Sequence, residues 1–126
     1  MKIQISTDHA IRILQYLHKN GGMYTAMEIA DAVGITYPFF IKIANQLKKH
    51  KFLMSVQGRN GGYALGKCAH KISLYDVFLC IEGKLQISNS IQRAERNDCE
   101  LSKAWYRLQD KMIEEMSSQY ITDLAS

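Results

Sequence analysis

The sequence lacks the features of secreted and membrane-spanning proteins. Its 126 residues contain no apolar run near the roughly eighteen residues that cross a bilayer, and Lys2, Asp8 and Arg12 interrupt the segment where an export signal would be apolar. The three cysteines lie 12 and 19 residues apart and form no close pair, so we expect reduced thiols. With 47% hydrophobic and 22% charged residues, the composition predicts a globular, cytoplasmic chain without a membrane partner.

Acidic residues are absent from one long block of the chain. Residues 32–75 carry a net charge of +7, whereas residues 1–31 are balanced and residues 76–126 carry −3. The cations of this acid-free block are Lys42, Lys48, Lys49, Lys51, Arg59, Lys67 and Lys71. Such a block indicates a surface for polyanions; the alternative is a solvated basic face without a partner.

The first half of the chain has the pattern of a helix-turn-helix. An amphipathic helix is predicted over residues 8–19, with Ser6 or Thr7 as its cap. A capping box formed by Thr25 and Glu28 opens a short second helix that ends at Gly34. A third helix follows, with a hydrophobic back and a front that mixes lysines with an amide, as in a recognition helix.

A glycine-rich hairpin follows directly. The periodicity predicts strands over 53–56 and 62–65, with Arg59 and Asn60 at the tip of the turn, which is the position of a wing. A phosphate-binding loop over 58–62 is the alternative. Such a loop needs a helix behind it, whereas the residues after Gly62 continue as a strand, so a nucleotide site is disfavoured.

The C-terminal part predicts a surface for self-association. A short helix is expected over 72–81, residues 84–98 show little periodicity, and a long amphipathic helix comes last. Its apolar face is expected to dimerise, and its residues are Leu101, Ala104, Trp105, Leu108, Met112 and Met116. The alternative is that this helix packs back on its own domain. The expected architecture is mainly α with a small β-hairpin: a winged helix-turn-helix domain over 1–83, and a variable loop with a dimerisation helix over 84–126.

Several of these segments resemble one family. The residues are Ser6-x-Asp8-x-Ala10-x-Arg12, GITYPFFIKIANQLKKHKFL, GRNGGYALG, ISLYDVFLCIEG, CELSKAW and the terminal ITDL. Together they look like the Rrf-type winged-helix transcriptional regulators, the bacterial family of IscR, NsrR and CymR. The resemblance implies a homodimeric transcription factor, with a recognition helix and a wing on DNA and a long helix that crosses to the partner.

The chain departs from this family in its cysteines. Cluster-binding members present three cysteines, about six residues apart, before the long helix, and only Cys99 matches, with Arg93 and Ile87 at the earlier positions. Asp8 resembles a non-cysteine ligand of nitric-oxide-sensing members, but one carboxylate and one thiol do not complete a cluster. No cofactor and no metal ligands are therefore expected. A thiol- or cluster-responsive sensor of the same family is the alternative, with Cys99 as the candidate redox thiol.

In the DNA-binding hypothesis, two recognition helices occupy successive major grooves of a near-palindromic operator on double-stranded DNA. Lysines and Arg59 neutralise phosphates, and the start of the recognition helix selects sequence. The candidate DNA-binding residues are Thr36, Tyr37, Pro38, Ile41, Lys42, Asn45, Lys48, Lys49, Arg59 and Asn60. An enzyme is disfavoured because the four histidines have no metal-ligand spacing. A winged-helix module for protein interaction is the remaining alternative.

Overall fold

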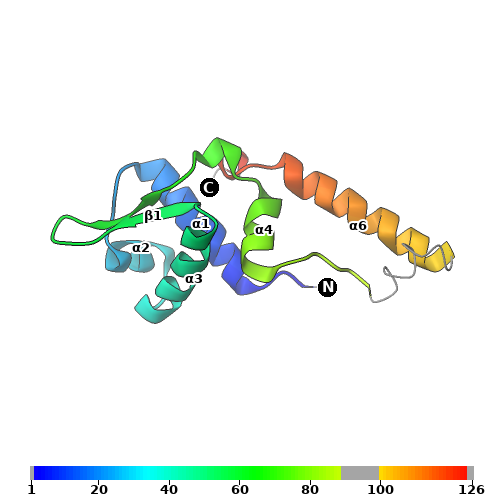
Figure 1. Cartoon of the computed structure of the whole chain (residues 1–126), viewed down its shortest axis with the longest axis horizontal. Coiled ribbons are helices and arrows are strands. Elements are labelled where there is room, and N and C mark those ends of the chain that lie inside the picture. The colour runs from blue at the N-terminus through cyan, green and yellow to red at the C-terminus, as the bar shows by residue number, and fades with distance from the viewer. Residues whose placement is uncertain (1, 89–99, 125–126) are drawn as a thin grey trace.

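The chain is elongated, with a body of packed helices and a hairpin at one end and a long helix that leaves this body (Figure 1). The computed structural model describes residues 2–88 and 100–124. Its elements are α1 (Ile5–Asn20), α2 (Ala26–Val33), α3 (Tyr37–Lys49), β1 (Leu53–Val56), β2 (Gly62–Leu65), η1 (Ala69–Lys71), α4 (Leu74–Glu82), α6 (Glu100–Ser118) and η2 (Ile121–Asp123). The mainly helical fold with one two-stranded antiparallel sheet confirms the predicted fold class. No helix in the described ranges is long and apolar enough to span a membrane.

Helix α1 is the centre of the body, where it contacts α2, α3, α4 and β2. Its buried apolar side chains are the predicted ones: Ala10, Ile13, Leu14 and Leu17. The predicted cap was wrong, because the helix starts at Ile5 and neither Ser6 nor Thr7 caps it. Instead, the Glu82 carboxylate at the end of α4 accepts hydrogen bonds from the Gln4 N–H, at 3.1 Å, and from the Thr7 hydroxyl.

The pair α2 and α3 forms as the local signals predicted. The Thr25 hydroxyl accepts from the Glu28 N–H at 3.1 Å, and the Glu28 carboxylate accepts from the Thr25 N–H at 3.0 Å, which completes the capping box. These bonds lower the pKa of Glu28. Gly34 ends α2 in the left-handed conformation, at φ 83°, and the Thr36 hydroxyl caps α3 by accepting from the Phe39 N–H at 3.3 Å.

The hairpin has the predicted strand bounds and is attached to the helices along one edge. Val56 pairs with Gly62 next to the turn, and Leu53 pairs with Leu65 at the base. On the other side of β2, Tyr24 and Tyr63 exchange two backbone hydrogen bonds of 3.0 and 2.7 Å. Because a Cβ on Gly62 would lie 2.4 Å from the Tyr24 carbonyl oxygen, only glycine allows this close approach.

The chain returns to the body after α6, which the sequence did not predict. The Ile121 N–H donates to the Ile72 carbonyl at 2.9 Å, and the Leu74 N–H donates to the Gln119 carbonyl at 2.8 Å. Ile121 is 2% exposed and belongs to the same hydrophobic core as α1 and α3. The last residues therefore help to hold the base of α6 against the body, and the division after residue 83 stays a prediction.

Candidate nucleic-acid interface

Helix α3 has one buried face and one exposed, basic face. The buried face, at 0% exposure, consists of Phe40, Ile43, Ala44 and Leu47. The exposed residues of the predicted DNA-binding set are Thr36, Tyr37, Pro38, Lys42, Asn45, Lys48 and Lys49. Ile41 differs from them, because it is partly buried and packs against the core. Thr36 accepts the cap hydrogen bond of α3, so its hydroxyl has a structural task as well.

The hairpin projects beyond the ends of α2 and α3, and its tip carries Arg59 and Asn60, both exposed (Figure 1). The turn is narrow: the Gly61 N–H donates to the Gly58 carbonyl at 3.1 Å, and a Cβ on Gly61 would lie 2.0 Å from the Val56 carbonyl oxygen. Glycine at position 61 therefore lets the loop close tightly enough to present the two polar side chains at its end.

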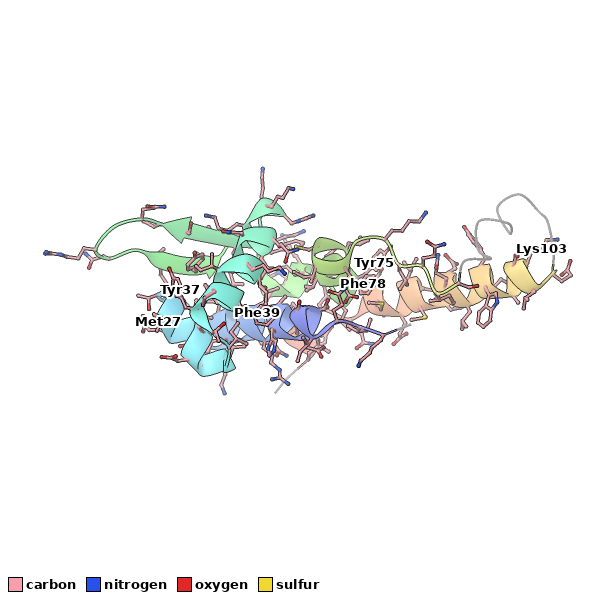
Figure 2. All side chains as sticks on the ribbon, turned by 90° about the horizontal axis from the view of Figure 1, so that it is seen from below. Met27, Tyr37, Phe39, Tyr75, Phe78 and Lys103 are labelled. Carbon is pink, nitrogen blue, oxygen red and sulfur yellow. The ribbon has the colours of Figure 1, made fainter. Side chains whose placement is uncertain are left out.

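Tyr63 joins the hairpin to α3. Its ring packs edge-to-face on the Phe40 ring, with the centroids 5.1 Å apart and the planes at 85°. Burial raises the pKa of Tyr63, and the neighbouring Tyr37 phenol raises it further. Figure 2 shows Tyr37 at the same end of the molecule as the hairpin, with Met27 of α2 beside this end of α3. The hairpin and the start of α3 thus form one connected surface.

The cations of this surface have no carboxylate partners in the described part of the chain. The ion pairs found there join Lys103 to Glu100 at 3.3 Å and Lys111 to Glu114 at 3.6 Å, and both lie within α6. The positive charge of α3 and the hairpin tip is therefore not neutralised by the chain itself in the ranges that are described. Because the glycine-rich turn leads into β2 and not into a helix, it lacks the geometry of a phosphate-binding loop for nucleotides.

Helix α6 exposes apolar side chains and buries polar ones. Leu101 is 61% exposed, Trp105 37% and Leu108 48%. The remaining predicted dimerisation residues are Ala104, which is exposed, and Met112 and Met116, which are partly buried. The apolar face predicted from the sequence is thus open to solvent in the single chain over the first half of the helix.

Two buried polar residues of α6, which border its apolar face, were missed by the sequence analysis. Ser102 is 0% exposed and Gln109 is 6% exposed. The Gln109 side-chain oxygen accepts a hydrogen bond from the Ile87 N–H at 3.0 Å, so it holds the chain that follows α4. A polar residue within an amphipathic pattern gives no local signal for such a contact, because its partner lies 22 residues away.

The described cysteines do not fit a metal cluster. Cys68 is exposed on the approach to η1, whereas Cys80 is buried in α4, where its thiol donates to the Gln46 carbonyl at 3.2 Å. Burial raises the pKa of Cys80 to about 11, so the free thiol stays protonated at neutral pH. The described residues contain no group of three or more His, Cys, Asp or Glu that could hold a metal ion. Cys99 lies outside the described residues.

Comparison with known proteins identifies close matches in fold. The sequence profile of the Rrf2 family, described as iron-dependent transcriptional regulators, matches residues 3–126. The structure of CymR, the global cysteine regulator of B. subtilis, aligns with a TM-score of 0.78 and 25% identity over 99% of this chain and 96% of that chain. IscR of T. potens aligns with a TM-score of 0.75 and 21% identity, covering 98% and 85% of the two chains. The oxidized form of Staphylococcus aureus CymR aligns with a TM-score of 0.77 and 22% identity, over 100% of this chain and 97% of that chain.

Proposed function

The chain belongs to the Rrf2 family of DNA-binding transcriptional regulators, which are not enzymes, and from this membership we propose that it is a homodimeric repressor of a near-palindromic operator. The resemblance found in the sequence is thereby confirmed. One observation supports the proposal most: the exposed, acid-free face of α3 and the hairpin tip form a single surface, joined through the Phe40–Tyr63 contact.

In the proposed complex, α3 enters the major groove and the hairpin follows the backbone or the minor groove. Lys42, Lys48, Lys49 and Arg59 neutralise phosphates, because flexible exposed cations provide affinity with little choice of sequence. Base recognition is assigned to the first turns of α3, where Lys42 can contact a base as well as a phosphate, and to the amides of Asn45 and Asn60; the other residues of this set are Thr36, Tyr37, Pro38 and Ile41. The amide of Asn45 has the donor and the acceptor that pair with adenine.

The proposed dimer forms through α6. Three exposed apolar side chains, Leu101, Trp105 and Leu108, lie on a helix that projects from the body, as Figure 1 shows. A symmetric pair of such helices would remove these side chains from water and place two copies of α3 on the same side of a duplex. The proposal includes no iron–sulfur cluster, because the described cysteines and carboxylates do not supply a set of ligands.

Selection of bound fragments from a random pool of duplex DNA tests this function. We expect enrichment of two half-sites in inverted orientation, with centres about one helical turn apart. The matched control is the variant in which Lys42 and Asn45 are both replaced by Ala, which should keep the fold, since both side chains are exposed, and should lose the enrichment. Absence of any enriched sequence, or enrichment of a single isolated half-site, would contradict the proposed dimeric repressor.

A further inference from the structure

A seam runs between the C-terminal end of α1 and the edge of β2 that faces away from β1. It consists of two adjoining hollows that share His18 and Leu65, and we call it the α1–β2 seam. The first hollow, of about 400 Å³, lies between the Gly21–Gly22 turn and β2. The second, of about 450 Å³, continues along residues 66–70. The seam does not include α3 or the hairpin tip, so it is separate from the DNA-binding surface proposed above.

The backbone of Leu65 faces this seam. In an antiparallel pair, residues that exchange hydrogen bonds with the neighbouring strand alternate with residues that point outward. The Gly66 N–H donates to the Phe52 carbonyl at 2.9 Å, and Tyr63 uses its N–H and carbonyl on the outer edge, toward Tyr24. Leu65 is two residues after Tyr63 and next to Gly66, so by this alternation its N–H and carbonyl point to the outer edge, as those of Tyr63 do.

The strand edge is open at Leu65 because the chain next to it turns away. Tyr24 pairs with Tyr63, and the continuation of that pairing would place Gly22 opposite Leu65. Gly21 and Gly22 instead adopt φ angles of 64° and 75°, and this turn leaves the first hollow. Within the described chain, no residue outside the hairpin forms a hydrogen bond with the Leu65 backbone. An N–H and a carbonyl are therefore both available, side by side, to an incoming strand.

The side chains around this edge are apolar or basic. Leu17 and Ala64 line the first hollow, and His18, Lys67 and His70 line the second. Neither hollow is lined by an aspartate or a glutamate. The Lys67 ammonium lies 5.9 Å from the centre of the Phe52 ring, and neither of the ion pairs in the described ranges includes it. The seam thus combines an open strand edge, an apolar floor and a border that carries the positive charge of Lys67 and no carboxylate.

We propose that the α1–β2 seam binds an acidic peptide segment of another protein in extended conformation, by strand addition to the Leu65 edge of β2. Strand addition uses backbone donors and acceptors for affinity and pockets for alternate side chains for specificity. The carbonyl of Leu65 needs a hydrogen-bond donor, which a phosphate backbone does not provide and a peptide N–H does. The acidic character of the partner follows from Lys67 on the border and from a lining without aspartate or glutamate in either hollow.

The test uses the full chain labelled with ¹⁵N and a blocked hexapeptide of alternating Glu and Val. We expect the amide resonances of Leu65 and Gly22 to shift, with a Kd of about 0.3 mM, and exchange of the Leu65 amide proton to slow about tenfold at saturation. The same peptide with N-methyl groups on alternate residues lacks the required donors, and should bind at least about tenfold more weakly. A peptide with Lys in place of Glu should also bind more weakly than the Glu–Val peptide.

The paired variants Lys67→Glu and Lys71→Glu separate a seam effect from a general charge effect. Both lysines are exposed and both substitutions change the charge by the same amount, but of the two only Lys67 lines the seam. We expect Lys67→Glu to raise the Kd of the Glu–Val peptide by about fivefold, and Lys71→Glu to raise it by less than about twofold. The circular dichroism spectrum of each variant checks that it is folded.

Three results would overturn the inference: no shift at Leu65 at a peptide concentration of about 3 mM, ten times the expected Kd; equal binding of the N-methylated peptide; or protection of the same amides by a short DNA duplex of arbitrary sequence. The last result would make the seam a phosphate site. None of these results depends on the operator, so failure here leaves the DNA-binding proposal in place, and failure of the operator selection leaves the peptide site in place.

Discussion

Replacement of Arg59 by alanine tests whether the hairpin tip contacts DNA. Arg59 is exposed, and within the described ranges no carboxylate pairs with it, so the variant should fold as the wild type does. We expect operator affinity to fall by about tenfold at physiological salt, which corresponds to about 1.4 kcal/mol. The loss should arise from phosphate contacts, and it should therefore change the salt dependence as well as the affinity.

The size of that change follows from the number of exposed cations on the proposed surface. Lys42, Lys48, Lys49 and Arg59 in two protomers give eight contacts, which predicts a slope of log K against log salt of about −7. Loss of Arg59 from both protomers removes two contacts, so the slope should become less negative by about 1.8. Fluorescence anisotropy of a labelled operator, titrated at several KCl concentrations, measures both quantities.

The matched control is Lys111→Ala, since this lysine is 77% exposed but lies on α6, away from the proposed DNA surface. It removes the same charge and should leave the slope and the affinity unchanged. If Arg59→Ala keeps the wild-type slope, or if Lys111→Ala changes it equally, the hairpin tip does not contact phosphates and the proposed role of the wing is wrong.

Three further predictions concern the dimer, the hairpin attachment and the buried thiol. Trp105→Asp should convert the dimer to a monomer in sedimentation velocity, because it places a charge on the apolar face of α6, whereas Arg107→Asp on the opposite face should remain dimeric; two dimeric variants would contradict the interface. Tyr63→Ala should lower the free energy of unfolding by about 2 kcal/mol in urea titrations, since the contact with Phe40 is lost, and Tyr63→Phe should lower it by much less. The thiol of Cys80 has a pKa of about 11 in the folded chain, against an ordinary value of 9.0. As the pH rises above 9, the thiol ionises in the unfolded chain before it does in the folded chain. The contribution of Cys80 to the free energy of unfolding should therefore be fully present below pH 9 and fall as the pH rises toward 11. Urea titrations of wild type and Cys80→Ala at pH 8 and 10 measure this term, and an equal fall in both proteins would show that Cys80 does not cause it.

Local signals were sufficient for the helix-turn-helix and the hairpin. The Thr25 capping box, the glycine after α2 and the glycine-rich turn each act over a few residues, so the bounds of α2 and of both strands could be predicted closely. The start of α1 could not be predicted in this way. Its first free N–H is satisfied by Glu82, a residue 78 positions away that no pattern near Gln4 indicates.

The C-terminal part shows the same limit. The apolar spacing of α6 predicted a helix and its exposed face, but the buried contact between Gln109 and the Ile87 backbone and the return of Ile121 to the core depend on tertiary packing. The candidate DNA-binding residues were predicted as a face of α3, and most of that face is exposed. Ile41 is the residue whose tertiary contacts the helical pattern did not reveal.

The attachment of the last residues gives α6 the properties of a lever arm. Its 19 residues measure about 28 Å along the axis, and its C-terminal end is fastened to the body through the backbone pairing of Ile72 with Ile121. A change of about 10° in the angle at which two such arms cross would move each body by about 5 Å, more than a hydrogen bond tolerates. In the proposed dimer, a small change in the crossing angle of the two α6 helices would thus be enough to move the two copies of α3 into or out of register with successive major grooves of DNA.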